Sequence, residues 1–416
     1  MIDTSEKKER FIAVAVATGQ DPFDPERSLE ELADLVDTAG GEVVYSVIQN
    51  MSSPSSATYV GSGKVEELRL LLDANEADGI VCDDELAPAQ MANLERELQT
   101  KVLDRTMVIL DIFAAHATTR EGKIQVEMAQ LAYRSSRLAG SLGTSMSRLG
   151  GGIGTRGPGE TKLETDRRAI RSRMARLRSQ IRDMEKTREI TRKARQKNML
   201  PTIAIVGYTN AGKSTLLNHL TGSRVLEEDQ LFATLDPTTR AMVMEEGEKV
   251  LLTDTVGFIH KLPHHLIDAF RSTLEEARYA DIILHVVDAS DPDQKMHMDV
   301  VYQTLSQLQI TGKPVITAFN KQDLVPAGEI TPMDPRADHT VKLSAARGFG
   351  VPDLLQAIQT VLKEFRKEIA QVIPYSQGAL LAKIHEQGHV LKEEYRPEGV
   401  YIEASVPESL NFGDFI

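Results

Sequence analysis

The sequence predicts a multidomain α/β protein. Apolar runs of strand length alternate with amphipathic helical stretches over residues 11–110 and again over 201–365, and a segment with long helical periodicity separates the two regions. Such alternation is typical of parallel sheets covered by helices. We expect four parts: an N-terminal parallel α/β domain (1–115), a long α-helical hairpin with a glycine-rich loop at 140–159 (116–199), a P-loop domain with a doubly wound, mostly parallel sheet (200–365), and a small C-terminal α+β appendage (366–416).

The composition is that of a soluble globular protein large enough for several cores, with 416 residues, 41% hydrophobic and 26% charged. No apolar run is long enough to cross a bilayer, and the charged N-terminus is unlike a signal peptide. The single cysteine, Cys82, excludes a disulfide framework, and the two apolar residues before it favour a buried structural thiol. We expect a cytoplasmic monomer, with peripheral membrane association left open.

The charge is unevenly distributed along the chain. The net charge is −13, but the stretch from Arg156 to Lys197 contains 15 Lys/Arg against 6 Asp/Glu. That local balance of +9 leaves −22 for the rest of the chain. The sequence therefore indicates a basic arm attached to an acidic body.

The N-terminal region alternates strands and helices. We expect strands at 11–16, 41–48, 79–82 and 108–113, with helices at 28–38, 65–74 and 88–99. Residues 59–64, YVGSGK, resemble a truncated phosphate loop. They lack the first glycine at the proper distance and a leading apolar strand, so a tight turn before a helix is favoured over a second nucleotide site.

The middle region has two helical stripes. Ile124, Met128, Leu131 and Leu138 lie on the first, and the second keeps the spacing of a coiled-coil seam through Leu163, Ile170, Met174, Leu177, Ile181 and Met184. Thr161 and Glu164 form a capping box that would start the second helix. The connection at 140–159 contains eight glycines, a length and composition that indicate either disorder or function.

The second helix of this hairpin is dominated by arginine. A solvated helix face usually mixes both signs of charge at i,i+4 spacing, and that reading stays open. The excess of one sign favours a phosphate-rich partner such as RNA. The arginines that surround this helix between residues 167 and 182 are Arg167, Arg168, Arg171, Arg173, Arg176, Arg178 and Arg182.

A strand, a glycine loop and a helix follow one another at the start of the third region. The loop matches G-x-x-x-x-G-K-[ST] at every fixed position, and backbone N–H groups of such a loop converge on phosphate oxygens. Lys213 is expected to reach the β- and γ-phosphates, and the Ser214 hydroxyl to bind Mg²⁺. The loop comprises Gly207, Tyr208, Thr209, Asn210, Ala211, Gly212, Lys213 and Ser214, with Thr215 next.

Two later motifs complete a guanine-nucleotide site. Asp254, Thr255, Val256 and Gly257 form D-x-x-G after a strand, where Asp254 would hold Mg²⁺ through water and the Gly257 N–H would contact the γ-phosphate. Asn320, Lys321, Gln322 and Asp323 form N-K-x-D after another strand. The Asp323 carboxylate can accept hydrogen bonds from the ring N–H and the exocyclic amine of guanine, which adenine does not offer. Backbone amides of Ser344, Ala345 and Ala346 would contact the guanine carbonyl.

A switch threonine is expected between the P-loop and D-x-x-G. Thr234, Thr238 and Thr239 all compete for the role of releasing Mg²⁺ when the γ-phosphate leaves. His260, His264 and His265 cluster after D-x-x-G, where a solvated switch is favoured over a metal site. Residues 366–416 are poorly informative, with a helix expected at 379–392 and a strand at 400–404.

The run GGGIGTRGPGET at 150–161, continuing into LETDRR at 163–168, strongly resembles the HflX family of translational GTPases. Residues 59–64 and 232–240 are also similar to that family. The resemblance implies a GTPase that binds the large ribosomal subunit and its rRNA through the hairpin and glycine loop, and that separates stalled ribosomes. It also implies Thr234 as the switch threonine on Mg²⁺, within a nucleotide-binding segment of Phe232, Ala233, Thr234, Leu235 and Asp236.

The residues that we single out for catalysis are Lys213, Thr234, Gly257 and Asn210. Phe258 stands where many GTPases have a water-orienting glutamine, so we expect slow intrinsic hydrolysis that a partner stimulates. Asn210 matches the P-loop asparagine of GTPases that recruit K⁺, or else it only favours the turn. Three functions remain open: a ribosome-splitting GTPase, a GTP-gated assembly or hibernation factor that only docks, and a signalling GTPase with no RNA role.

Overall fold

The computed structural model describes residues 8–19, 23–146, 158–197, 200–222, 231–232, 235, 237–244, 247, 249–263, 266, 276–326, 333–364 and 366–407. By compactness the chain divides into two units, each described here by itself. Unit 1 comprises Met1–Met184, Glu228–Asp236 and Ile259–Ser272, and unit 2 the remainder. Among the described residues, no helix is long and apolar enough to span a membrane.

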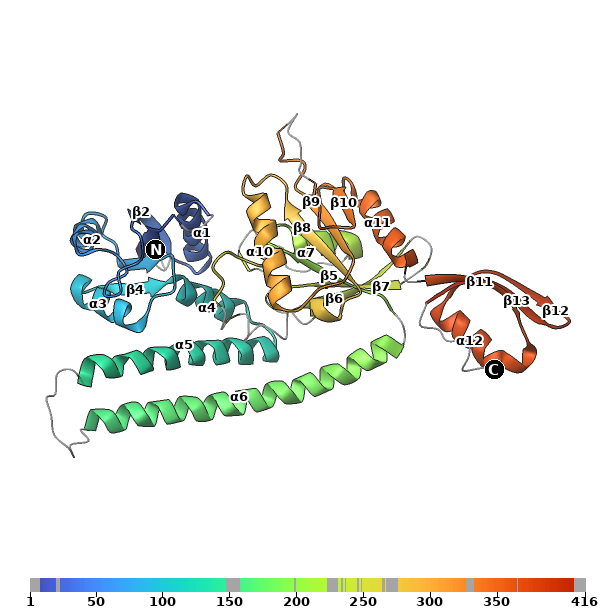
Figure 1. Cartoon of the computed structure of the whole chain (residues 1–416), viewed down its shortest axis with the longest axis horizontal. Coiled ribbons are helices and arrows are strands. Elements are labelled where there is room, and N and C mark those ends of the chain that lie inside the picture. The colour runs from blue at the N-terminus through green and yellow to red at the C-terminus, as the bar shows by residue number, and fades with distance from the viewer. Residues whose placement is uncertain are drawn as a thin grey trace, which may run out of the picture. The chain divides into compact units, whose positions relative to one another are not determined.

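The N-terminal part of unit 1, in blue in Figure 1, contains a parallel sheet, as the sequence predicts. Its strand order is β2-β1-β3-β4. Its apolar strand residues, such as Ile12 and Ile80, are fully buried, and Cys82 is a buried thiol in the same core. The elements are β1 (Arg10–Ala17), α1 (Pro25–Thr38), β2 (Glu42–Asn50), α2 (Ser62–Ala74), β3 (Gly79–Cys82), α3 (Pro88–Leu98), β4 (Lys101–Asp104) and α4 (Arg105–His116).

One strand prediction in this domain is wrong. Residues 108–113 lie inside helix α4, and the fourth strand is β4, immediately before it. The Asp104 side chain accepts a hydrogen bond from the Met107 backbone N–H at 2.9 Å, which caps the helix start. Because α4 is buried on most of its surface, its sequence is mainly apolar, and residues 108–113 are interrupted only by Asp111. Periodicity cannot distinguish so short an apolar run from a buried strand.

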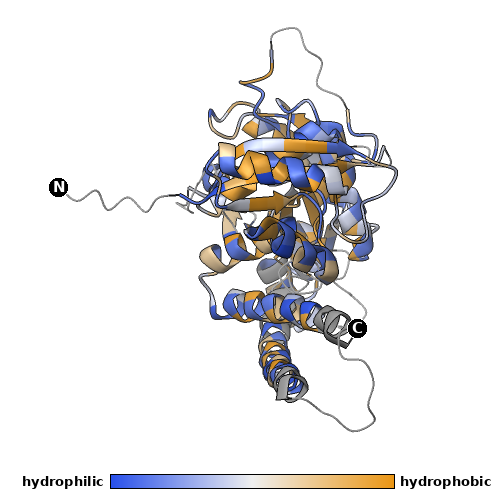
Figure 2. Cartoon of the chain, turned by 90° about the vertical axis from the view of Figure 1, so that its left-hand side faces the viewer, coloured by the Kyte–Doolittle hydropathy of each residue, from blue (hydrophilic) through white to orange (hydrophobic). Residues whose placement is uncertain are grey.

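Two long helices form the predicted hairpin. Figure 1 shows α5 (Arg120–Met146) and α6 (Pro158–Lys197) side by side. Arg173 on α6 donates to both carboxylate oxygens of Glu127 on α5, at 2.6 and 2.9 Å, and Leu177 is 1% exposed. In Figure 2 hydrophobic residues are concentrated in the sheet layers, while hydrophilic residues line much of the long helices.

The hairpin differs from the sequence prediction at both inner ends. Helix α6 begins at Pro158, so Thr161 lies within its first turn and is not the N-cap. Proline suits that position because the first helical N–H groups have no intrahelical acceptor. Helix α5 continues to Met146, so the first part of the glycine-rich connection is helical. Residues 147–157 lie outside the described residues.

The P-loop domain in unit 2 contains a sheet with the strand order β10-β9-β8-β5-β7-β6. All described strand pairs are parallel except β6 with β7. Strand β6 covers Thr238 and Thr239, two candidate switch residues, and the sequence analysis did not foresee it. The elements are β5 (Thr202–Gly207), α7 (Lys213–Thr221), β6 (Thr238–Val243), β7 (Lys249–Asp254), β8 (Ile282–Asp288), α10 (Gln294–Gln307), β9 (Val315–Asn320), β10 (His339–Lys342) and α11 (Val351–Glu364).

The described residues of the C-terminal part form a small antiparallel sheet, β11-β13-β12, against which helix α12 packs. Val400, Ile402, Ala404 and Val406 alternate along β13 and are buried. The predicted helix at 379–392 ends earlier, at Gln387, because His389 begins strand β12 after Gly388. The elements are β11 (Arg366–Ile373), η1 (Tyr375–Gln377), α12 (Gly378–Gln387), β12 (His389–Arg396) and β13 (Gly399–Pro407).

Candidate nucleotide-binding site

The P-loop connects β5 to α7 at the carboxyl edge of the parallel sheet, where ligands bind in open α/β folds. Gly212, just before α7, has φ +88°, and a Cβ atom there would lie 2.3 Å from Asn320 Nδ2. Both the backbone conformation and the close approach therefore require glycine at this position. Asn210 also has positive φ, at +57°, which asparagine tolerates better than most side chains.

Lys213 is held inside the loop. Its side chain is 7% exposed, and Nζ donates to the Tyr208 carbonyl oxygen at 2.7 Å. Burial lowers the pKa of Lys213 to about 8, with Asp254 opposing that shift and Lys321 adding to it. The positive charge of Lys213 is only partly balanced by Asp254, so a bound phosphate would stabilise the ammonium form.

We predict that nucleotide affinity falls as the pH rises above about 8. A bound triphosphate stabilises the Lys213 ammonium and raises its pKa, so binding below pH 8 meets an already charged lysine, whereas binding above it must first add a proton. Titrations with a fluorescent GTP analogue between about pH 6.5 and about pH 9, with proton uptake followed by calorimetry, test this. Constant affinity with no proton uptake across that interval would contradict it.

Two oxygen ligands suited to Mg²⁺ lie together below the loop. The Ser214 hydroxyl donates to Asp254 Oδ2 at 2.8 Å, and Asp254 is fully buried at the end of β7. A hydroxyl and a carboxylate beside a phosphate-binding loop match the hard-oxygen preference of Mg²⁺. The residues present therefore fit the ion. Thr255 fixes the turn that follows, because its hydroxyl donates to the Ile205 carbonyl oxygen at 2.7 Å.

The D-x-x-G segment is tied to the P-loop by backbone hydrogen bonds. The Phe258 N–H donates to the Gly207 carbonyl oxygen at 3.1 Å, and the Thr209 N–H donates to the Phe258 carbonyl oxygen at 2.7 Å. A Cβ at Gly257 would lie 2.9 Å from Thr209 Cα and 3.1 Å from Lys213 Nζ. Gly257 is therefore packed against the loop beside the lysine ammonium. Val256 and Phe258 are both buried.

The N-K-x-D motif is connected to the P-loop through Asn320. Its Nδ2 donates to the Ala211 carbonyl oxygen at 2.9 Å, and its Oδ1 accepts from the Ala345 N–H at 2.8 Å. Lys321 Nζ lies 2.8 Å from Asp288 Oδ2 at the end of β8. Asn320 therefore links the P-loop to the loop of Ser344, Ala345 and Ala346. Gln322 lies between Lys321 and Asp323 in the motif.

Asp323 has two partners near this loop. Hydrogen bonding from Ser344 and then the charge of Arg347 hold the pKa of the Asp323 carboxyl below its ordinary value. Arg347 Nε lies 3.1 Å from Asp323 Oδ2, and its side chain is 70% exposed. Neither Arg347 nor Asp288 was foreseen from the sequence, because no short motif specifies them.

The proposed switch segment is described only in part. Phe232 and Leu235 are buried in unit 1, whereas Ala233, Thr234 and Asp236 lie outside the described residues, as do His264 and His265. Thr239 pairs its hydroxyl with that of Thr253 across β6 and β7, at 2.9 Å. No cluster of three or more His, Cys, Asp or Glu side chains suited to a metal is found among the described residues.

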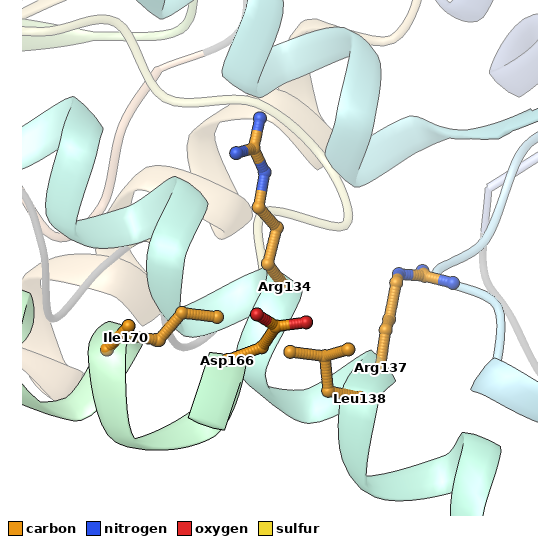
Figure 3. Close-up of a pocket in the computed structure, with 6 residues that line it drawn as sticks. Arg134, Arg137, Leu138, Asp166 and Ile170 are labelled. Carbon is orange, nitrogen blue, oxygen red and sulfur yellow. The ribbon is translucent and has the colours of Figure 1, made fainter. Parts of the chain in front are cut away.

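A hollow of about 540 Å³ lies between α5 and α6 in unit 1 (Figure 3). Arg134, Arg137 and Leu138 line it from α5, and Asp166, Ala169 and Ile170 from α6. The positive charge of Arg137 is balanced by an ion pair, because its Nη2 lies 2.6 Å from the buried Asp104 carboxylate. This ion pair connects the second half of α5 to the end of strand β4.

Family models match most of the chain in three consecutive segments. Residues 26–114 match a model described as GTP-binding GTPase N-terminal, residues 116–195 the GTP-binding GTPase middle region, and residues 202–321 a 50S ribosome-binding GTPase. Together with the site geometry, these matches define the class of the protein as a P-loop GTP-binding GTPase.

Relatives of similar length narrow this class. The chain is 55% identical over 410 residues to GTPase HflX of Lacrimispora saccharolytica, covering 99% of this chain and 96% of the relative. It is 40% identical over 406 residues to GTPase HflX of Escherichia coli, covering 96% and 93%. The chain belongs to the HflX family of GTPases. Among solved structures, a GTP-binding protein from Sulfolobus solfataricus in complex with GDP is similar at 24% identity, with 85% of this chain and 99% of that chain covered and a TM-score of 0.44.

Proposed function

We propose that this GTPase binds the large ribosomal subunit in its GTP form and separates stalled ribosomes into subunits. The observation that carries the proposal is the long helix α6, where most of the arginines whose side chains the structure describes are exposed. The nucleotide site lies on the same chain. Exposed guanidinium groups along one helix suit the phosphates of rRNA. The matched description of a 50S ribosome-binding GTPase supports the same partner. A ribosomal partner places the protein in the cytoplasm.

The site residues have distinct proposed roles. Lys213 and the amides of the P-loop bind the β- and γ-phosphates, and the Gly257 N–H contacts the γ-phosphate. Asp323 selects guanine, while Asn320 keeps its loop against the P-loop. Ser214, Asp254 through water and the switch residue Thr234 would hold Mg²⁺, which neutralises phosphate charge when bound.

We predict slow hydrolysis by the isolated protein and strong stimulation by large subunits. Phe258 is 2% exposed and apolar, so it cannot orient an attacking water. If Asn210 recruits K⁺ beside the phosphates, turnover will also be faster in potassium than in sodium. Steady-state rates in either salt, with and without purified large subunits, measure both effects. Rapid turnover that is indifferent to the partner and the cation would refute them.

A placeholder that docks without splitting is the second candidate. It shares the nucleotide site and the arginine helix, so only the fate of the ribosome distinguishes it. Whole ribosomes are incubated with the protein and a non-hydrolysable GTP analogue and then sedimented. Free subunits support splitting. Protein that co-sediments with intact ribosomes supports the placeholder instead.

A further inference from the structure

Two loops of the P-loop domain, the N-K-x-D loop after β9 and the loop after β10, are fixed to one another by backbone hydrogen bonds. The Gln322 N–H donates to the Leu343 carbonyl oxygen at 3.2 Å, and the Leu343 N–H donates to the Phe319 carbonyl oxygen at 2.9 Å. These bonds continue the parallel pairing of β9 with β10 beyond the strand ends. Side chains of the second loop therefore lie within reach of the Asp323 carboxylate.

The loop after β10 is a closed turn that contains Arg347. The Ser344 N–H donates to the Phe349 carbonyl oxygen at 2.9 Å, and the Arg347 N–H donates to the Ser344 carbonyl oxygen at 3.2 Å. The next residue, Gly348, has φ +72°, a left-handed conformation that favours glycine. The backbone position of Arg347 is therefore set by the turn, although its side chain is 70% exposed.

Arg347 acts on Asp323 through its side chain and through its backbone. Its Nε lies 3.1 Å from Asp323 Oδ2. Its N–H also donates to Ser344 Oγ at 3.3 Å, and the buried Ser344 hydroxyl donates in turn to the Asp323 carboxylate. An ionised carboxylate has about four acceptor sites, so these two side chains do not exhaust it. Asp323 can keep both partners while it accepts from guanine.

We propose that Arg347 is a positioning residue for Asp323 and thereby sharpens the selection of guanine. The ring N–H and the exocyclic amine of guanine point the same way, so both carboxylate oxygens must lie near the plane of the base to accept them. Rotation of an aspartate carboxylate about its terminal bond is only weakly restricted by the side chain itself. The guanidinium on Oδ2, together with the Ser344 hydroxyl, restricts that rotation. The inference rests on the proposed role of Asp323 and deepens it.

The consequence is a selective effect on nucleotides that carry the exocyclic amine. Inosine diphosphate keeps the ring N–H of GDP and lacks that amine, so it needs only one carboxylate oxygen. A carboxylate that rotates more freely serves inosine diphosphate nearly as well as a fixed one. Loss of the Arg347 side chain should therefore weaken GDP more than inosine diphosphate, whereas damage to the fold or to the phosphate site would weaken both alike.

The test measures dissociation constants of GDP and inosine diphosphate for the full chain. In Arg347→Met we expect the preference for GDP, the ratio of the two constants, to fall about threefold to fivefold, which is the contribution typical of an exposed ion pair. Arg336→Met is the matched control, since Arg336 is partly exposed and pairs with Asp299 at 2.8 Å in the same domain. This control should leave the ratio unchanged, and thermal unfolding shows whether each variant is folded.

A second measurement needs no variant. Salt screens an exposed ion pair, and GDP and inosine diphosphate carry the same phosphates, so the ratio of their constants isolates the effect on the base. In the unaltered protein the preference for GDP should fall as the salt concentration rises from about 0.05 M to about 1 M. In Arg347→Met it should stay constant over the same range.

Three results would overturn the inference. The first is an unchanged ratio in Arg347→Met, which includes equal weakening of both nucleotides. The second is a stronger preference for GDP in that variant, which would mean that Arg347 competes with guanine for the carboxylate. The third is a preference in the unaltered protein that does not respond to salt. If the unaltered protein does not prefer GDP to inosine diphosphate at all, the proposed guanine-selecting role of Asp323 fails as well.

Discussion

Replacing Asp323 with asparagine is expected to move the base preference of the site from guanine to xanthine. The carboxylate accepts from both the ring N–H and the exocyclic amine of guanine, and xanthine has a carbonyl in place of that amine. An asparagine side chain can accept from the ring N–H and donate to that carbonyl. Two hydrogen bonds to a charged group contribute about 1.5–3 kcal/mol each, so GTP should bind roughly 100-fold more weakly or worse.

Losing the ion pair between Asp323 and Arg347 should cost little stability in Asp323→Asn. Arg347 is largely exposed, and an exposed ion pair typically contributes less than about 1 kcal/mol. Competition binding with GTP, XTP and ATP measures the preference directly. Asp353→Asn, an exposed change in the first turn of α11, is the matched control. GTP binding that survives in Asp323→Asn with no gain for XTP would show that another group reads the base.

Removing three exposed arginines from α6 should weaken binding to large ribosomal subunits and flatten its salt dependence. Arg171, Arg176 and Arg178 are exposed, whereas Arg173 is committed to Glu127. Each phosphate contact contributes about 0.7–0.9 to the slope of log affinity against log salt, so the slope should fall by about 2–3 in the triple glutamine variant. Affinity at moderate salt should fall about tenfold or more.

The control for this variant removes the same charge elsewhere. Arg27, Arg69 and Arg96 are exposed on the N-terminal domain, and replacing them with glutamine should leave the salt slope unchanged. Nucleotide affinity should be equal in both triple variants. If the two variants lose subunit binding equally, the interaction depends on total charge and not on α6.

Much of the fold could be predicted because local sequence motifs and the longer alternation of strands and helices indicate the same structure. The strand, glycine loop and helix around Gly212 are specified by sequence within a short stretch, and the parallel N-terminal sheet follows from regular alternation. Helix α4 was missed because most of its residues are buried, so it has no broad polar face to show the 3.6-residue period. Strand β6 was missed because its burial is uneven, with one buried residue among exposed and half-buried ones.

Motifs that fix both residue type and spacing could single out Lys213, Asp254 and Asn320, whose roles stay predictions. Partners supplied from distant parts of the chain could not be singled out in this way. Asp288 beside Lys321, like Asp83 and Asp84 beside Lys261, is an ordinary carboxylate in the sequence, and only the fold brings these carboxylates to those lysines. The roles of Thr234, Gly257 and Asn210 stay predictions.

The central claim is that a guanine nucleotide with its γ-phosphate controls docking of the arginine helix on the large subunit. Its most direct test is co-sedimentation of the protein with purified large subunits in the presence of a non-hydrolysable GTP analogue, GDP or a non-hydrolysable ATP analogue. We predict that the GTP analogue brings the protein into the pellet and that the other two do so at least about tenfold less well. Equal co-sedimentation with all three nucleotides, or none with any, would contradict the account.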